Sequence, residues 1–537
     1  MSAVFPSDGG RKAIRAAISA AAVVFIATAA LPPAASAKVF RWAATTDPQT
    51  LDPHAVNSAP VLGFLNNVYE GLVRRDRDMR IEGALAESWE PLGEAGWRFH
   101  LRHGVTFHDG AAFTAEDVLF SFQRASAEEA DVRSWFAPVS EVRVVDDFTV
   151  DFMTKGPNPI FPDSIANFMI MDKDWAEAKG AARASTQSET YATLNANGTG
   201  AFRVVERSPG VRTVLAPFAG WWGRPEHNIT EAIFTPITQQ ATAVAALISG
   251  EVDFINPVPL QDVPRLEQAS GVKVLRGTEA RVIMLGFAHK AAGLKFSDET
   301  AAANPLSDPR VRKAIYQAID VETLIARVMR GNAAPASLLV SPTMHGYSPA
   351  LERRHPFDAE AARAQLAAAG YAEGFSFGLA CPNDRYINDA SVCTAVAAML
   401  AKVGLKVKLR TMPVRQYWPE LRADQFDMYL LGWSPGTLDA EHPVRFLLAT
   451  PDAEKKLGSW NFGGFSSAQI DDLLPKIQRE IDPASRQAML DDVHRILQQE
   501  VAYVPLYVQP LVWGMRANID VAQRSDNFFI LRWVRVN

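Results

Sequence analysis

The sequence predicts an α/β fold built on a largely parallel sheet. In the second half of the chain, apolar runs that are too short for helices alternate with amphipathic segments of helical length. Several of these segments stop at a glycine, such as Gly370 or Gly404, which is a common end signal of a helix. Strands separated by helices are typical of βαβ units, and such units build parallel sheets.

Size and composition narrow the class of protein. The 537 residues are 48% hydrophobic and 21% charged, as in ordinary globular proteins, and this length suggests roughly two to four domains. The net charge of -6 argues against a general nucleic-acid-binding protein. The sequence contains no P-loop or H-E-x-x-H motif. We therefore expect no enzymatic activity, no catalytic residues and no cofactor.

The first 37 residues read as a signal peptide. Basic residues near Arg11 precede an alanine-rich apolar stretch, residues 16–31, and Ala35-Ser36-Ala37 matches a cleavage site. An uncleaved membrane anchor is the alternative, but the stretch is only weakly hydrophobic. We expect cleavage after Ala37 and a soluble, periplasmic product.

The chain has two cysteines, Cys381 and Cys393. Neither follows the cleavage site, so no lipid anchor is expected. A disulfide between them and two buried thiols fit the sequence equally well, because the sequence does not supply the distance between them.

The first half of the mature chain is predicted to consist mainly of strands and turns. A helix should open at Thr114, which can cap free backbone N–H groups, with Asp117 in its first turn. Further helices are expected at 61–72 and 238–249. Strands are expected at 38–42, 97–102, 105–107, 142–153 as a hairpin, 202–205, 211–215 and 252–255.

Three histidines in this half, His100, His103 and His108, invite a metal site. If 97–102 is a strand, His100 points outward while the other two lie in turns. Convergence on one ion is then not expected, and we predict no metal site.

The second half supplies the βαβ pattern. Asp308, Asp320 and Asp358 are expected to cap successive helices. Helices are also expected at 390–403, 468–477 and 483–500. Strands are expected at 375–380, 405–409, 428–431, 503–508 and 528–534.

One loop carries the residue types of a ligand site. The strand 428–431 ends at Gly432 and Trp433, and turn formers and then Asp439 follow. Ligands of open α/β sheets bind at the carboxyl ends of the strands. An ordinary strand-to-helix loop with a packing tryptophan is the alternative.

A second loop, 381–389, follows another predicted strand at the same edge. Its residues Arg385 and Tyr386 are therefore expected near Trp433 and Asp439.

The segment WRFHLRHGVTFHDGAAFTAEDVLFSFQ, residues 97–123, resembles a characteristic segment of the peptide/nickel class of extracellular solute-binding proteins of ABC importers, family 5. The similarity spans roughly 450 residues, in the order that the family has. The segments that carry it are LDPHAVNSAPVLGFLNNVYEGLV, ALAESWE, NGTGAFRVVE, GWWGRPEHN, AVAALISGEVDF, DPRVRKAIYQAID and VPLYVQP.

The resemblance implies a two-lobe periplasmic-binding-protein fold of type II, with an extra inserted domain and a ligand cleft between the lobes. Lobe 1 would comprise 38–285, with the inserted domain at about 75–197. Lobe 2 would comprise 286–504, and 505–537 would return to lobe 1.

The resemblance also implies site residues. Arg385, followed by Tyr386, matches an arginine that pairs with the ligand carboxylate in peptide-binding members, as a guanidinium fork allows. Those members hold the peptide ammonium with an aspartate shortly after the tryptophan that matches Trp433. Here Pro435 and Gly436 stand at that place.

Asp439 matches a second acidic position further along the same loop. Either Asp439 binds the ammonium, or the ligand has no free amine there. Tyr417 and Trp418 would add stacking surface, with core packing as the alternative for both.

The function that the resemblance implies is capture of a small peptide or peptide-like solute by lobe closure. A monomer would then deliver the solute to an inner-membrane ABC permease with its ATPase subunits. The alternatives keep the fold and change the ligand to an oligosaccharide, an opine-like conjugate or a metal chelate. A role in chemosensing fits the sequence as well as transport does.

Overall fold

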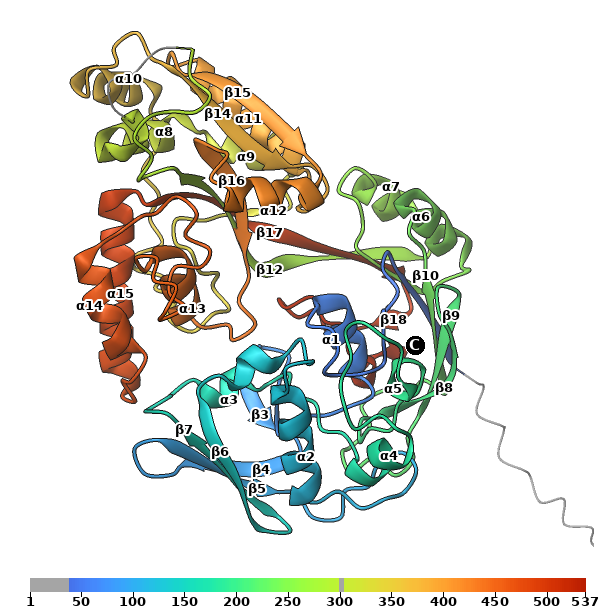
Figure 1. Cartoon of the computed structure of the whole chain (residues 1–537). Coiled ribbons are helices and arrows are strands. Elements are labelled where there is room, and N and C mark those ends of the chain that lie inside the picture. Colours follow the sequence, from blue (N-terminus) through green and yellow to red (C-terminus); the bar gives the residue numbers. More distant parts are fainter. Residues whose placement is uncertain (1–37, 299–303) are drawn as a thin grey trace, which may run out of the picture. The chain divides into compact units, whose positions relative to one another are not determined.

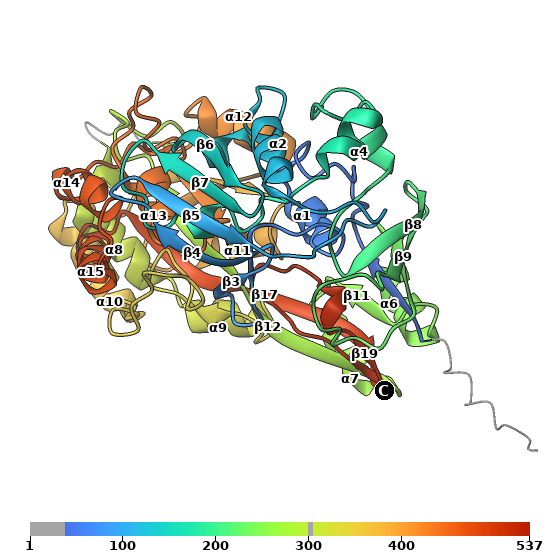
Figure 2. The same ribbon diagram turned by 90° about the horizontal axis from the view of Figure 1, so that it is seen from below.

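The computed structural model describes residues 38–298 and 304–537 (Figure 1). The predicted signal peptide lies outside the described residues. Two long strands, β12 (Val272–Phe287) and β17 (Tyr503–Arg516), pair antiparallel in the middle of an 11-stranded sheet of the described part of the chain. They run side by side in both views (Figures 1 and 2). The sheet order is β15-β14-β16-β12-β17-β11-β1-β10-β9-β8, and the short strand β13 (Ala334–Pro335) pairs with β17 outside this order.

One side of the sheet contains the first strand of the mature chain. β1 (Val39–Ala44) is parallel to both β10 (Glu231–Pro236) and β11 (Phe254–Asn256). The carboxyl ends of these three strands therefore meet at one edge. β9 (Arg212–Pro217) and β8 (Phe202–Ser208) extend this side as an antiparallel pair.

The other side has the βαβ arrangement that the sequence predicts. β14 (Ser376–Pro382) is parallel to β15 (Lys406–Met412) and to β16 (Met428–Trp433), with α11 (Asp389–Ala401) between β14 and β15. Every residue of β14 and β16 is buried, as expected for strands that are covered on both faces.

A separate sheet of order β4-β5-β7-β6 has its own aromatic core. α2 (Ala115–Ser126) packs against it and begins as predicted, because the backbone N–H of Thr114 donates to Asp117 Oδ2 at 2.9 Å. The strands of this sheet are β4 (Ala86–Pro91), β5 (Gly96–Leu101), β6 (Val139–Asp146) and β7 (Thr149–Thr154).

The remaining elements are shorter or lie on the surface of the two sheets. The other strands are β2 (Val73–Arg75), β3 (Ile81–Gly83), β13 (Ala334–Pro335), β18 (Ile519–Asp520) and β19 (Arg535–Val536). The other helices are α1 (Ala59–Leu65), α3 (Phe161–Ser164), α4 (Lys173–Ala178), α5 (Tyr191–Leu194), α6 (Gln240–Ser249), α7 (Val263–Gln268), α8 (Pro309–Ala318), α9 (Val321–Arg327), α10 (Ala359–Ala368), α12 (Val414–Arg422), α13 (Glu441–Pro443), α14 (Ala468–Ile477) and α15 (Pro483–Glu500), with short turns of helix at Arg133–Phe136, Pro305–Ser307, Val444–Leu448 and Leu531–Trp533.

Most predicted elements are present, and α14 and α15 agree residue for residue with the prediction. Two predicted strands are wrong. Residues 105–107 contribute a single bridge, Thr106 to Ala112, and residues 528–534 form a buried segment with one helical turn. Both segments are apolar because they are buried. Apolar composition alone does not distinguish a buried strand from a buried loop.

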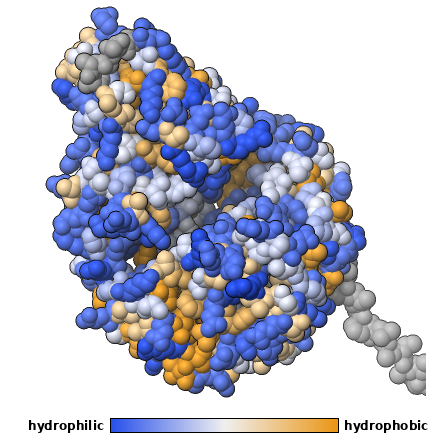
Figure 3. Space-filling model, viewed as in Figure 1, coloured by the Kyte–Doolittle hydropathy of each residue, from blue (hydrophilic) through white to orange (hydrophobic). Residues whose placement is uncertain are grey.

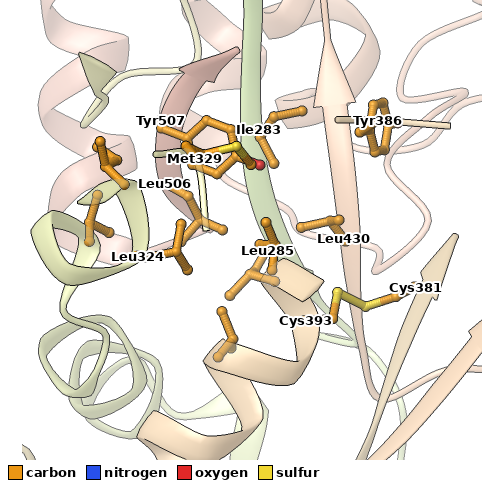
Figure 4. Close-up of a cluster of buried hydrophobic side chains, with 14 of the residues drawn as sticks. Ile283, Leu285, Leu324, Met329, Cys381, Tyr386, Cys393, Leu430, Leu506 and Tyr507 are labelled. Carbon is orange, nitrogen blue, oxygen red and sulfur yellow. A yellow bond between two sulfur atoms is a disulfide. The ribbon is translucent and has the colours of Figure 1, made fainter. Parts of the chain in front are cut away.

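Cys381 on β14 and Cys393 on α11 form a disulfide. Of the two alternatives that the sequence left open, the structure therefore has the covalent one. Figure 4 shows the pair beside Leu285 and Leu430, in a core that helix and strand share.

None of the helices within residues 38–298 and 304–537 combines the length and apolar character needed to cross a bilayer.

The buried histidine His54 should make the protein less stable in mild acid. Its Nε2–H donates to the Met169 carbonyl oxygen at 2.9 Å, and its Nδ1 accepts from Arg124 at 3.0 Å. Burial, reinforced by the Arg124 charge, lowers the pKa of His54 to about 4. In the unfolded chain, His54 takes up a proton with a pKa of about 6.5. The contribution of neutral His54 to the free energy of unfolding is therefore complete above pH 6.5 and is lost as the pH falls toward 4.

Because of His54, we expect the free energy of unfolding to fall by about 2 kcal/mol when the pH is lowered from 7.5 to 5. Denaturant titrations of the wild type and of His54→Gln at both pH values measure this. Gln keeps one donor and one acceptor but does not titrate, so the variant should lose less stability on acidification. An equal loss in both proteins would contradict the assignment.

Candidate functional site

The carboxyl ends of β14 and β16 bring two predicted loops together. Tyr386, in the loop after β14, has its hydroxyl 3.5 Å from the carbonyl oxygen of Gly432 at the end of β16. A Cβ at Gly432 would lie 2.6 Å from the Tyr386 ring, so the close approach requires glycine there. The predicted proximity of these loops is therefore present in the structure. Gly436 lies at the exposed tip of the second loop.

Arg385 is exposed beside this contact, with its guanidinium carbon 5.3 Å from the centre of the Tyr386 ring. The loop is held in place by Asp389, whose Oδ2 accepts from the backbone N–H groups of Arg385 and Tyr386 at 2.9 and 3.0 Å. Among the residues that the structure describes, no carboxylate pairs with the Arg385 guanidinium. The site thus presents an uncompensated positive charge on a rigid loop.

Trp433 forms the centre of an aromatic group. Its ring lies 5.4 Å from His442, 6.0 Å from Phe446 and 5.6 Å from Trp460, measured between ring centres. Its indole N–H is buried and has no hydrogen-bond partner in the described part of the chain. Burial, with the Arg445 charge, lowers the pKa of His442 to about 3, so this histidine is neutral.

Tyr417 and Trp418 lie on α12 and differ in exposure. Tyr417 is fully buried and donates its hydroxyl hydrogen to the Leu430 carbonyl oxygen at 2.5 Å. Trp418 is partly exposed and packs edge-on against Trp460 at 5.4 Å. Tyr417 is therefore a core residue in this structure, and Trp418 extends the aromatic group of Trp433.

Asp439 has a cationic partner within the protein. Arg486 on α15 donates from both terminal nitrogens to the two carboxylate oxygens, each at 2.8 Å, and Asp439 is 1% exposed. One of these oxygens also accepts from the backbone N–H of Glu441 at 2.8 Å. This pairing ties the loop after β16 to the helix behind it.

The β12–β17 pair is irregular next to these loops. The pairing shifts register between Thr278 and Val282. Glu279, within the shift, accepts from Arg281 at 2.9 Å and from Gln509 at 2.5 Å. Gln509 in turn accepts from the backbone N–H of Ile387 at 3.4 Å. This chain of polar contacts links the middle of the long strands to the Arg385 loop.

A cavity of about 180 Å³, with Glu279 in its wall, lies at the carboxyl ends of β1, β10 and β11. Five aromatic residues are part of its lining, and Asn256, Glu279 and Asp526 are among its polar groups. The sequence reasoning did not find these residues. No local pattern marks them, because they come from segments that only the sheet brings together.

Polar contacts join the loop after β16 to the N-terminal part of the chain. Arg75 donates to the Thr437 carbonyl oxygen at 2.8 Å and pairs with Asp163 at 3.2 Å. His345 lies 3.7 Å from the same Asp163. The face of the molecule seen in Figure 3 is hollowed at its centre, and hydrophilic residues surround much of the hollow.

The three histidines that suggested a metal do not converge. His100 is exposed near Glu90, His103 stacks on Phe148, and the His108 ring bonds to the backbone of Gly200. Within residues 38–298 and 304–537, no group of three His, Cys, Asp or Glu side chains is arranged to hold a metal ion.

Comparison with known proteins identifies relatives of the whole chain. The model of the bacterial extracellular solute-binding proteins, family 5 middle, matches residues 80–455. The glutathione-binding protein GsiB of Salmonella choleraesuis (strain SC-B67) is 25% identical over 502 residues, 91% of this chain and 92% of GsiB.

Two solved structures are similar over nearly their whole length. The periplasmic binding protein DppA of Helicobacter pylori, in complex with the peptide STSA, is 23% identical, covers 93% of this chain and 98% of its own, and has a TM-score of 0.73. AgaA of A. tumefacien R10, in complex with agropinic acid, is 23% identical, covers 93% and 99%, and has a TM-score of 0.70.

These structures share the two-lobe α/β fold that the resemblance implied. The family model covers most of the chain. The chain belongs to the family 5 bacterial extracellular solute-binding proteins.

Proposed function

We propose that this protein is the substrate-binding component of an ABC importer and that it captures a small peptide or peptide-like solute between its two lobes. The closed form then delivers the solute to an inner-membrane permease powered by ATPase subunits. A ligand that contacts both lobes stabilises the closed state by its differential affinity for that state. The names of GsiB and DppA support a peptide-like ligand.

The observation that carries the proposal is the unpaired charge of Arg385. It lies on a loop fixed by Asp389, next to Tyr386 and the end of β16. A guanidinium without an internal partner suits a carboxylate, which it can bind through two parallel charge-assisted hydrogen bonds. We therefore assign the ligand carboxylate to Arg385.

The aromatic side chains supply the second element of the site. Trp433 has a buried indole N–H without a partner among the described residues, Tyr386 contacts the end of β16, and Trp418 packs against Trp460. Such rings bury large apolar area while retaining a polar tip for orientation. In our proposal they pack along the ligand backbone, with Gly436 leaving its loop tip open.

Three carboxylates of the protein near the site have arginine partners, and this favours an alternative class of ligand. Asp439, Glu279 and Asp526 pair with Arg486, Arg281 and Arg524, respectively. A free ammonium group would therefore compete with an arginine for each of them. This favours a carboxylate ligand whose amine is substituted, as in an opine-like conjugate. AgaA, which has this fold, was solved in complex with agropinic acid, which supports an organic acid as a ligand class.

The remaining parts of the proposal concern location and assembly. We propose that residues 1–37 are removed after Ala37, that the protein works in the periplasm as a monomer, and that it catalyses no reaction. The similarity to DppA, an ABC transporter-associated periplasmic binding protein, supports this location.

Native mass spectrometry of the purified protein, followed by release of what is bound, tests the proposal. A peptide or a substituted amino acid bound in one copy per protein is the expected result. A bound sugar or chelate would overturn the ligand class. Absence of any bound molecule, together with no thermal stabilisation by peptides or amino-acid conjugates, would overturn the function.

A further inference from the structure

The hairpin of β2 and β3 is anchored in one hydrophobic core and reaches into another. Val73, at its base, is buried in the core of the β4-β5-β7-β6 sheet, and Ile81 packs against the same core. Met79, in the turn of the hairpin, is 4% exposed and belongs instead to the core around β16. All the other buried residues of that core that the structure describes lie within 280–508. Met79 is therefore a single apolar side chain that joins two bodies of the protein.

The turn, residues 76–80, is built to present this side chain. Asp76 Oδ1 accepts from the backbone N–H groups of Asp78 and Arg80 at 2.8 and 2.9 Å. The backbone N–H of Asp76 donates to the Arg80 carbonyl oxygen at 2.9 Å. These bonds lie within the turn, so they do not depend on what Met79 packs against. Met79 has a φ of 68°, which is uncommon for a long side chain and points to a functional constraint.

The composition of the turn suits both a buried and a withdrawn position. Arg77, Asp78 and Arg80 are charged and exposed, and Met79 is the one uncharged residue among 76–80. The rest of the turn therefore stays in water whether or not Met79 is inserted. Methionine is unbranched and adapts to irregular spaces, so it can leave and re-enter a core without a closely matched socket.

The polar contacts beside Met79 can be broken at little cost. The Arg75 guanidinium donates to the Met79 carbonyl oxygen at 3.0 Å, to Asp163 Oδ1 at 3.2 Å and to the Thr437 carbonyl oxygen at 2.8 Å. The first two partners belong to the body that holds the hairpin, whereas Thr437 lies in the loop after β16. If the two bodies separate, Arg75 keeps its counter-charge and loses one hydrogen bond to a neutral carbonyl.

The same contact region is continuous with the proposed ligand site. The backbone N–H of His345 donates to the Leu438 carbonyl oxygen at 2.9 Å, and its ring lies 3.7 Å from Asp163. The loop that His345 and Arg75 thus contact is the one that carries Trp433 and Gly436. A contact made by one apolar side chain and a few polar groups is small, and small contacts between domains generally permit relative motion.

We propose that residues 76–80 form a latch that sets how readily the two lobes open. Insertion of Met79 stabilises the arrangement in which Arg75 holds the loop after β16, and withdrawal of Met79 accompanies opening. Met79 and Arg75 are positioning residues that change the affinity without touching the ligand, because a ligand that binds only closed molecules is held in proportion to their fraction. The inference rests on the proposed function, in which closure of the lobes captures the solute.

The distance between the two bodies tests the latch without any ligand. Arg143 on β6 and Arg479 just after α14 are exposed, and spin labels on cysteines at these positions (Arg143→Cys with Arg479→Cys) report the distance by pulsed electron paramagnetic resonance. Cys381 and Cys393 are paired in a disulfide and take no label. Met79→Gln, which brings an amide to the core, should lower the ratio of short-distance to long-distance molecules about fivefold.

Three further variants locate the effect. Arg80→Gln makes the same substitution at an exposed neighbour in the turn and should leave the distances as they are in the wild type. Met79→Leu keeps an apolar side chain and should also resemble the wild type. Met79→Ala shortens the side chain without adding a polar group, and it replaces Met79→Gln if that variant does not fold.

Binding measurements connect the latch to ligand capture. The probes are Ala-Ala and N-acetyl-alanine, which cover a free and a substituted amine. Met79→Gln should raise the Kd of a bound probe by up to the factor by which the distance ratio falls, mainly through faster dissociation. Arg80→Gln should bind the probe as the wild type does.

The outcomes separate the latch from the function on which it rests. An unchanged distance ratio in Met79→Gln identifies Met79 as a fixed part of the core and overturns the latch, even where the melting temperature falls. Failure of both probes to bind the wild type counts against the proposed function, whereas a shifted distance ratio in the ligand-free protein still supports the latch.

Discussion

Replacement of Arg385 by alanine should raise the Kd for a carboxylate ligand by about tenfold or more. A hydrogen bond to a charged group contributes about 1.5–3 kcal/mol, and about 1.4 kcal/mol corresponds to a factor of ten. Arg385 is exposed and, in the described part of the chain, pairs with no carboxylate, so its removal should leave the stability of the protein unchanged. Calorimetry and a thermal melt measure the two effects separately.

Three controls sharpen this test. Arg479, also exposed, lies just after α14, away from the loop, and Arg479→Ala should bind as the wild type does. Arg385→Lys keeps the charge but loses the planar fork, so an intermediate Kd is expected. Amidation of the ligand carboxylate should weaken binding to the wild type but not to Arg385→Ala. Unchanged affinity in Arg385→Ala would remove this residue from the site.

Asp439→Asn should lower the free energy of unfolding by about 3–5 kcal/mol, because it leaves the Arg486 guanidinium buried without its counter-charge. Both carboxylate oxygens contact that guanidinium at 2.8 Å, and the carboxylate is almost completely buried. Denaturant titration at pH 7 measures the loss.

A double variant distinguishes an ion pair from a general packing defect. Asp439→Leu combined with Arg486→Met replaces both charges by apolar groups and should recover much of the stability. A loss below about 1 kcal/mol in Asp439→Asn would contradict the structural role. Weaker binding of free peptides than of N-acetylated ones by Asp439→Asn would instead assign the carboxylate to the ligand amine.

Local chemistry made the helices predictable. Asp308, Asp320 and Asp358 each accept from a backbone N–H in the first turn of the following helix, as their positions in the sequence predict. α12, which contains Pro419, was not predicted, whereas α14 was predicted although Pro475 lies inside it.

β12 was missed for a different reason. Its first half carries Lys273, Arg276 and Glu279 in no regular alternation, because the strand twists through a register shift and serves both parts of the sheet. The site shows the same limit. Arg385, Tyr386 and Trp433 lie at or just after strand ends and could be placed near one another from their positions, whereas the contact of Asn256 with Asn527 joins segments far apart in the chain.

The place of β17 in the sheet determines when the newly made polypeptide can fold. Residues 503–516 are among the last to be synthesised, yet they pair with β12 along almost its whole length and with β11, and they complete three of the hydrophobic cores. A chain that leaves the ribosome amino end first therefore lacks the central partner strand until about 95% of it has been made. Until then β11 and β12 lack this partner strand, so the sheet and the cores to which they belong cannot be completed.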